Sequence, residues 1–242
     1  MPQYPMTPGA VFTTPFAAEE RVTSFLRSVY GWMCAGLAVT ALVAWYVASS
    51  PSLVMTIART PFLALGLMVA QLGLVGVLSF RVHKMAPATA GALFIGYSAL
   101  TGVTMSFILL AYTLQSVAST FVVAAAMFGS MALYGTVTKR SLAGWGQFLF
   151  MGLIGVVIAS FVGMFWQSDP LQFILAFCGV VVFTGLAAYD AQKLKAMALA
   201  IPNAAGTGGG TSSYAIVGAL SLYLDFINLF LMLLRLLGDR RR

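Results

Sequence analysis

The sequence predicts an all-α integral membrane protein, a bundle of seven transmembrane helices with the last helix at its centre. Of the 242 residues, 60% are hydrophobic and only 8% are charged, whereas about a quarter of the residues of a soluble domain carry charge. The apolar residues gather in seven runs of roughly the 20 residues that cross a bilayer. The 13 Lys and Arg residues flank these runs, which is typical of topology signals and argues against nucleic acid as a partner.

Residues that end helices separate the seven runs. In chain order the breaks are Ser49-Ser50-Pro51, Arg81 to Pro87, Gln115-Ser116, Lys139-Arg140-Ser141, Ser168-Asp169-Pro170 and Asn203 to Ser213. All but Gln115-Ser116 carry Pro, Gly or charge, which favour turns. We therefore predict helices at 29–49, 61–80, 87–112, 116–137, 145–166, 171–189 and 213–237.

These helices form a predicted transmembrane domain over residues 29–238, with a tail on each side. Residues 1–28 contain four prolines and lack the basic-then-apolar order of a secretory signal, so they predict a disordered polar tail. Residues 239–242 predict a basic C-terminal tail.

Positive charge marks alternate connections between the runs. The residues concerned are Arg21, Arg27, Arg81, Lys84, Lys139, Arg140, Lys193 and Lys195. Because connections rich in Lys and Arg stay in the cytoplasm, we expect a cytoplasmic N-terminus. Seven crossings would then put Arg240-Arg241-Arg242 on the opposite side. Either the eight earlier charges set the topology in spite of this tail, or the last helix re-enters the membrane without crossing it. The length of the last apolar run favours a true crossing.

One carboxylate, Asp225, stands in the middle of the last apolar run. An aspartate there costs about 2.5–3.5 kcal/mol of insertion free energy, whereas the fourteen Leu, Ile, Phe and Val residues of 216–237 return about 4–8 kcal/mol. The helix therefore inserts in spite of its acid.

Steps of three and four residues place the polar groups of this helix on one line. This polar seam consists of Gly218, Ser221, Asp225, Asn228, Met232 and Arg235. Lipid offers the seam no hydrogen-bond partners, so it should face the bundle interior and make the last helix central, with Ser221 and Asn228 supporting Asp225. The structural alternative is that Asp225 and Asn228 only hold helices together.

A second acid, Asp190, lies at the predicted inner end of the sixth helix, in YDAQKLK. Beside Lys193 it is consistent with an ordinary solvated helix end. Arg81, at the inner end of the second predicted helix, shares its side of the membrane, so charge and depth permit an Arg81–Asp190 ion pair. At 1.5 Å per residue Asp190 and Asp225 would differ in depth by about 10–15 Å, a gap that helix tilt must close.

The segments GLAAYDAQKLK (185–195) and GALSLYLDFINLFLMLLRLLG (218–238), in this order, closely resemble the C-terminal signature of the Bax inhibitor-one family, also called the transmembrane Bax-inhibitor-motif family. SFRVHK extends the resemblance more loosely over about residues 20–238, whereas KMAPATAGALF stands where the family often has a Gly-Pro signature. The resemblance implies seven helices with the last wrapped by the others. It also implies a pH-sensitive calcium leak, with Asp190 and Asp225 as its aspartate pair and Arg81 as a latch on one of them.

Two neighbouring carboxylates in a low dielectric would share a proton and titrate as one coupled unit. Ca²⁺ takes six to eight oxygens, and the two carboxylates with Ser221 and Asn228 supply too few for a tight cage. We therefore expect weak binding of Ca²⁺ or another cation in transit at Asp190 and Asp225, no tight metal site and no cofactor.

Two other functions compete with the leak. An intramembrane aspartyl protease also carries two membrane aspartates, but it needs a GxGD segment where residues 222–225 read Leu-Tyr-Leu-Asp, so we expect no enzyme. A membrane-embedded regulator that binds a quality-control protease or a stress-response protein stays open. The lack of a signal peptide and the family resemblance favour a bacterial inner membrane.

Overall fold

The computed structural model describes residues 15–81, 84–166, 168–200 and 212–241, and these residues are helical apart from short connections and one isolated backbone bridge. The helices are α1 (Pro15–Ala48), α2 (Pro51–Arg59), α3 (Pro61–Arg81), α4 (Pro87–Ala111), α5 (Leu114–Val137), α6 (Ala143–Phe165), α7 (Asp169–Ala200) and α8 (Ser213–Leu237). In this part of the chain six helices, all except α2 and α3, are long and apolar enough to cross a membrane. Within α3 the apolar stretch Leu65–Arg81 is shorter than these spans. The all-α membrane fold is therefore confirmed. The prediction of exactly seven spans is not, because the described residues contain six candidate spans.

The helix boundaries follow from local chemistry. Proline opens α2 and α4, where its missing N–H costs nothing because the first turn has no partner for it. Thr113 caps α5 by accepting a hydrogen bond from Ser116 N, and Ser212 caps α8 by accepting one from Ala215 N. Only Tyr112 and Thr113 separate α4 from α5, so this break lies slightly before its predicted position.

Two helices extend beyond their predicted bounds. Residues 15–28, predicted to be tail, form the first turns of α1, where Phe25 is completely buried; residues 1–14 lie outside the described residues. Helix α7 ends at Ala200 and not near 189, because Ala191, Leu194 and Ala198 continue its buried face. The nine-residue helix α2 was not predicted at all, since it buries none of its described residues.

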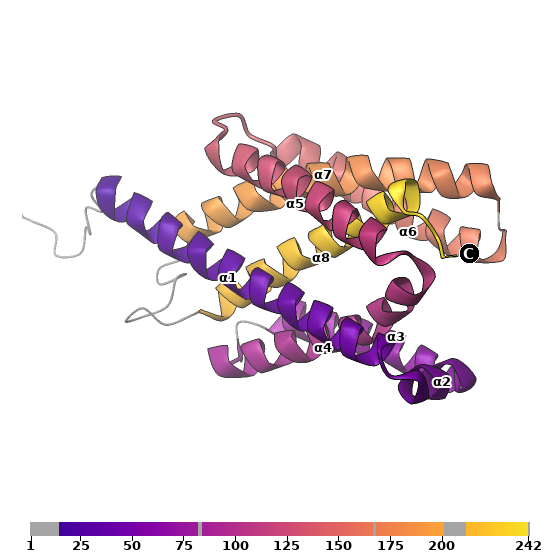
Figure 1. The fold of residues 1–242 in the computed structure, drawn as a ribbon. Coiled ribbons are helices and arrows are strands. Elements are labelled where there is room, and N and C mark those ends of the chain that lie inside the picture. Colours follow the sequence, from indigo (N-terminus) through magenta and orange to yellow (C-terminus); the bar gives the residue numbers. More distant parts are fainter. Residues whose placement is uncertain (1–14, 82–83, 167, 201–211, 242) are drawn as a thin grey trace, which may run out of the picture.

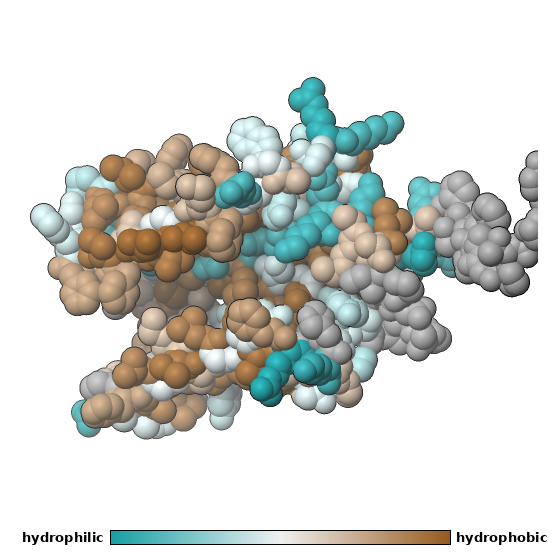
Figure 2. Space-filling model, turned by 180° about the vertical axis from the view of Figure 1, so that it is seen from behind, coloured by the Kyte–Doolittle hydropathy of each residue, from teal (hydrophilic) through white to brown (hydrophobic). Residues whose placement is uncertain are grey.

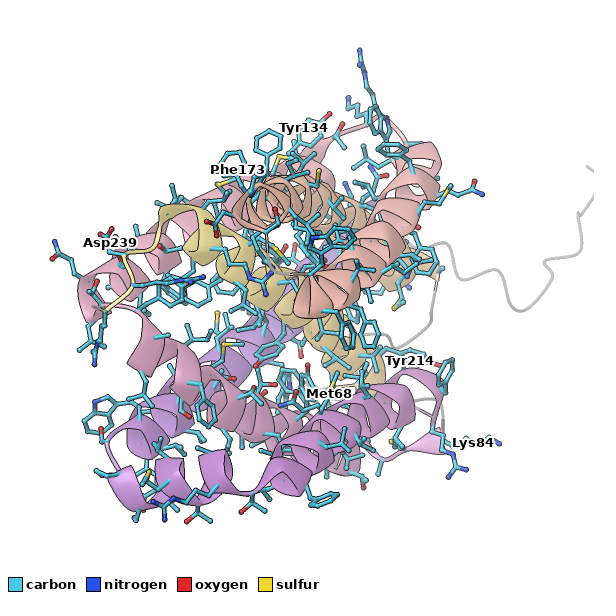
Figure 3. All side chains as sticks on the ribbon, turned by 90° about the vertical axis from the view of Figure 1, so that its right-hand side faces the viewer. Met68, Lys84, Tyr134, Phe173, Tyr214 and Asp239 are labelled. Atoms are coloured by element: carbon cyan, nitrogen blue, oxygen red, sulfur yellow. The ribbon has the colours of Figure 1, made fainter. Side chains whose placement is uncertain are left out.

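Helix α8 lies at the centre of the bundle, as the polar seam predicts. It packs against α7, α1, α5 and α4, and most of its residues are buried (Figure 1). Figure 3 shows α8 passing between a layer of α5, α6 and α7 on one side and a layer of α2, α3 and α4 on the other. Within the second layer α3 packs on α4, at the edge of the bundle.

Tyr223 joins the central helix to its neighbours. It is the largest fully buried side chain of the described chain, and its hydroxyl lies 2.6 Å from Thr40 Oγ1 on α1. Thr40 Oγ1 is also 2.9 Å from the carbonyl oxygen of Ser98 on α4. The edges of the Phe94 and Tyr97 rings meet the Tyr223 ring, with centroids 5.7 and 5.8 Å apart, a favourable geometry for aromatic pairs. This contact fixes the rotation of α8 two residues before Asp225.

Apolar side chains cover the outside of the bundle. Phe62 and Phe80 of α3 are each 84% exposed, and Phe165 of α6 is 79% exposed. Figure 2 shows apolar residues over both lobes of one face, with a hollow between them. A soluble monomer rarely exposes apolar surface on this scale, so lipid is the solvent of this surface.

Candidate functional site

The polar seam of α8 faces α7. An added Cβ at Gly218 would meet Leu194 of α7, and Met232 packs against Gly179 of the same helix. Between them, Asp225 is only 7% exposed, and Asn228 is half-buried. Arg235 lies past the buried part of the seam and is exposed. Protein, not lipid, therefore surrounds the carboxylate of Asp225.

The structure brings Asp190 of α7 to this seam. Ser221 Oγ donates a hydrogen bond to Asp190 Oδ2. Because Ser221 precedes Asp225 by four residues, or about 6 Å along the helix, Asp190 contacts α8 one turn before Asp225. The expected depth gap of about 10–15 Å rested on a helix that ends near 189, whereas α7 continues ten residues beyond Asp190, to Ala200, and brings the Asp190 side chain to Ser221.

Asp225 has charged neighbours but no hydrogen-bond donor on one of its oxygens. Its charge interacts with those of Asp190 and Lys193. Asp225 Oδ2 is buried and accepts no hydrogen bond from the described residues. A buried carboxylate without full pairing lowers stability, and an intramembrane acid of this kind marks a functional site by default.

Arg81 does not join the two aspartates in this structure. It is the exposed last residue of α3, and α3 packs on α4 in the layer opposite α7. Lys84, three residues further on, lies at the outer edge of that layer in Figure 3. The cation whose charge acts on Asp190 is Lys193, and no Arg81–Asp190 ion pair forms among the residues that the structure describes. The latch stays a prediction.

The site offers few metal ligands. In the described ranges no three residues among His, Cys, Asp and Glu gather where they could hold a metal ion. The oxygens of Asp190, Ser221 and Asp225 fall short of a Ca²⁺ coordination sphere without water. The arrangement therefore suits a proton or a weakly held, still hydrated cation.

A second polar region, which sequence reasoning did not predict, lies at the C-terminal end of α8. The C-terminal segment is tied to the α4–α5 connection: Thr113 N donates to Asp239 O (3.1 Å), Arg241 N donates to Ala111 O (2.9 Å) and Asp239 N donates to Ser116 Oγ (2.8 Å). The predicted basic tail is thus held in place over residues 239–241. Next to it opens a cavity of about 820 Å³ between α4, α7 and α8, lined by charged residues that include Asp169, Arg235 and Arg240; Figure 2 shows a hollow at this end.

The fold and the site together define a class: an all-helical membrane protein whose central, last helix carries a buried aspartate beside a second one on the preceding helix. A sequence model of the family described as "Inhibitor of apoptosis-promoting Bax1" matches residues 22–242, and the chain belongs to this Bax inhibitor-one family. The resemblance of the two C-terminal segments is thereby confirmed. The family match agrees with the multi-pass membrane architecture of the chain.

Three bacterial relatives align over nearly the whole chain. Inner membrane protein YbhL of Escherichia coli K12 is 50% identical over 218 residues, which cover 90% of this chain and 92% of that protein. An uncharacterised protein of Deinococcus radiodurans is 43% identical, with 91% of this chain and 93% of that protein covered. An uncharacterised membrane protein of Streptococcus pyogenes is 36% identical, with coverages of 91% and 95%.

Proposed function

We propose that this protein is a pH-sensitive leak for Ca²⁺ or another cation in a bacterial inner membrane. One observation carries the proposal: Asp190 of α7 is hydrogen-bonded to Ser221 of α8, one turn before Asp225, and its charge acts on Asp225. Two acids on adjacent helices inside a membrane bundle lower the stability of the fold, so stability does not explain their presence. Such residues mark ion or proton pathways.

The coupled chemistry of the pair supplies the pH sensitivity. Two interacting carboxylates take up protons in two steps that belong to the pair and not to either residue. Acidification therefore changes the number of negative charges that a cation meets at the α7–α8 interface. Lys193 is the cationic side chain whose charge acts on both aspartates in the described structure, so it belongs to the same electrostatic unit.

Calcium flux into liposomes, followed over a series of pH values, tests the proposal. Asp225→Asn keeps the shape of the side chain but cannot titrate, so we expect a folded protein whose flux no longer depends on pH. Asp190→Asn should change the profile as well. Glu20→Gln, which removes an exposed acid at the start of α1, is the matched control and should behave as wild type. Unchanged pH-dependent flux in both Asn variants would remove the pair from the mechanism and favour the regulator alternative.

The proposal includes the topology. We propose that α3 is a seventh crossing, since it connects the end of α2 to the start of α4 and packs along α4, and that the N-terminus is cytoplasmic. Reporter fusions that are active on only one side of the membrane, placed before α1 and after α8, test this. Both reporters active on the same side would contradict it.

A further inference from the structure

An apolar groove runs between α1 and α5, with α8 as its floor. Its volume is about 480 Å³, and its lining includes Leu26 and Leu37 of α1, Ala125 and Gly129 of α5, and Phe226 of α8. A smaller cavity of about 130 Å³ shares Leu37 and Phe226 and extends the groove along α1. Ala125 and Gly129 are exposed, so the groove opens sideways to the surroundings of the bundle.

The length of the groove matches one leaflet of a bilayer. Its lining on α1 runs from Leu26 to Leu37, eleven residues that span about 17 Å at 1.5 Å each. The hydrocarbon core of a bilayer is about 30 Å thick, so one leaflet takes up about 15 Å. A single acyl chain would therefore fill the groove from end to end.

The polar residues of the groove gather at one end. Thr136, in the last turn of α5, and Tyr30, one turn after Leu26 on α1, line the end nearer Leu26. There Lys195 of α7, which is half-buried, donates a hydrogen bond from Nζ to the carbonyl oxygen of Thr136 (2.6 Å). The cationic side chain of Lys195 thus lies at one end of the apolar groove. A lipid with an apolar chain and a negatively charged head group is complementary to this arrangement.

We propose that this groove binds one acyl chain of an anionic phospholipid, with the phosphate of the lipid beside Lys195. The chain would lie on Phe226 and fill the space between α1 and α5. This site is separate from the aspartate pair, and the proposal does not depend on cation flux.

Lipid retention measured by native mass spectrometry tests the proposal. The full chain is reconstituted in vesicles of equal parts phosphatidylglycerol and phosphatidylcholine and then extracted in mild detergent. Wild type should retain a single phosphatidylglycerol. Ala125→Phe, which fills the groove, should lose it, whereas Ala126→Phe should keep it, because Ala126 is also exposed but does not line the groove.

Two further variants keep the test sharp. Gly129→Leu fills the groove from a position where an added Cβ meets nothing within 4 Å, so it should also lose the lipid in a folded protein. Lys195→Ala should reduce the preference for phosphatidylglycerol over phosphatidylcholine about fivefold, the factor expected for one cation near an anionic lipid. Lys84→Ala, an exposed lysine outside the groove, should leave that preference unchanged.

Three results would overturn the proposal. The first is that folded Ala125→Phe and Gly129→Leu retain phosphatidylglycerol as wild type does. The second is an unchanged lipid preference in Lys195→Ala. The third is a dimer that Ala125→Phe dissociates, which would show that a second copy, and not a lipid, occupies the groove.

Discussion

Replacing Gly135 by alanine should separate two helices that position the aspartate pair. An alanine Cβ at this position of α5 would meet the carbonyl group of Ala188 on α7, with the carbonyl carbon only 2.8 Å away. Ala188 precedes Asp190 by two residues. Because both partners are backbone or bound directly to it, no side chain can turn aside, and α5 would have to move away from α7.

Gly129 on the same helix provides the matched comparison. An added Cβ there meets nothing within 4 Å. Both substitutions gain the same helix propensity, about 1 kcal/mol, so this term cancels between them. The difference that remains is the cost of the forced contact at 135, about 1–3 kcal/mol by analogy with overpacked cores. For a chain of this size it corresponds to about 2–12 °C in unfolding temperature.

Thermal unfolding of both variants in the same detergent measures this difference. We expect Gly129→Ala to unfold at or above the wild-type temperature and Gly135→Ala to unfold about 2–12 °C below Gly129→Ala. If Gly135→Ala is as stable as Gly129→Ala, the close approach of α5 to α7 is not a constraint on the fold, and the reasoning fails.

Three other predictions concern contacts around the site. Tyr223→Phe removes the hydrogen bond to Thr40 and should lower the free energy of unfolding by about 0.5–1.5 kcal/mol; a double-mutant cycle with Thr40→Val should show that the two losses are not additive. If Arg81 latches the leak at neutral pH, liposomes with Arg81→Ala should leak at every pH, and Arg81→Lys should also close less well, since lysine lacks the bidentate contact; closure equal to wild type in both would refute the latch. Deleting residues 239–242 should speed hydrogen exchange at the amide of Thr113, which loses its acceptor on Asp239; unchanged exchange would mean that the C-terminal segment does not hold the α4–α5 connection.

Composition and spacing were enough to predict every helix of the described residues except α2, and the central place of the last one. The polar seam was the decisive signal, because only protein can surround Ser221 and Asp225 without leaving them unpaired. Breaks at Pro51 and Pro87 also lie where proline opens a helix in the structure. The spacing of the seam and the positions of the prolines are local features, so a single sequence is enough to detect them.

The errors arose where charge masked a buried face. Because Glu19, Glu20 and Arg21 are charged, the start of α1 was predicted to be a polar tail, although the same helix buries Phe25. Lys193 and Lys195 made Asp190 read as a solvated helix end, although Ala191, Leu194 and Ala198 repeat at helical spacing beyond it. That repeat was available in the sequence and would have extended the predicted helix beyond Asp190.

Other contacts had no local signal. The Tyr223–Thr40 hydrogen bond joins residues 183 positions apart, and the separation of Arg81 from Asp190 depends on which helix α3 packs against. Both follow from how the helices are arranged in the bundle, and the spacing of residues along a single helix does not predict that arrangement.

The helix at the centre of this bundle is made after all of the helices that it packs against. At roughly 5–20 residues per second, the 25 residues of α8 take about 1–5 s to synthesise. Until then α1, α4, α5 and α7 lack the helix that they pack against, and Asp190 lacks Ser221. A chain that stops before α8 therefore loses its core and not its edge, so final assembly of the bundle in the membrane waits for this helix.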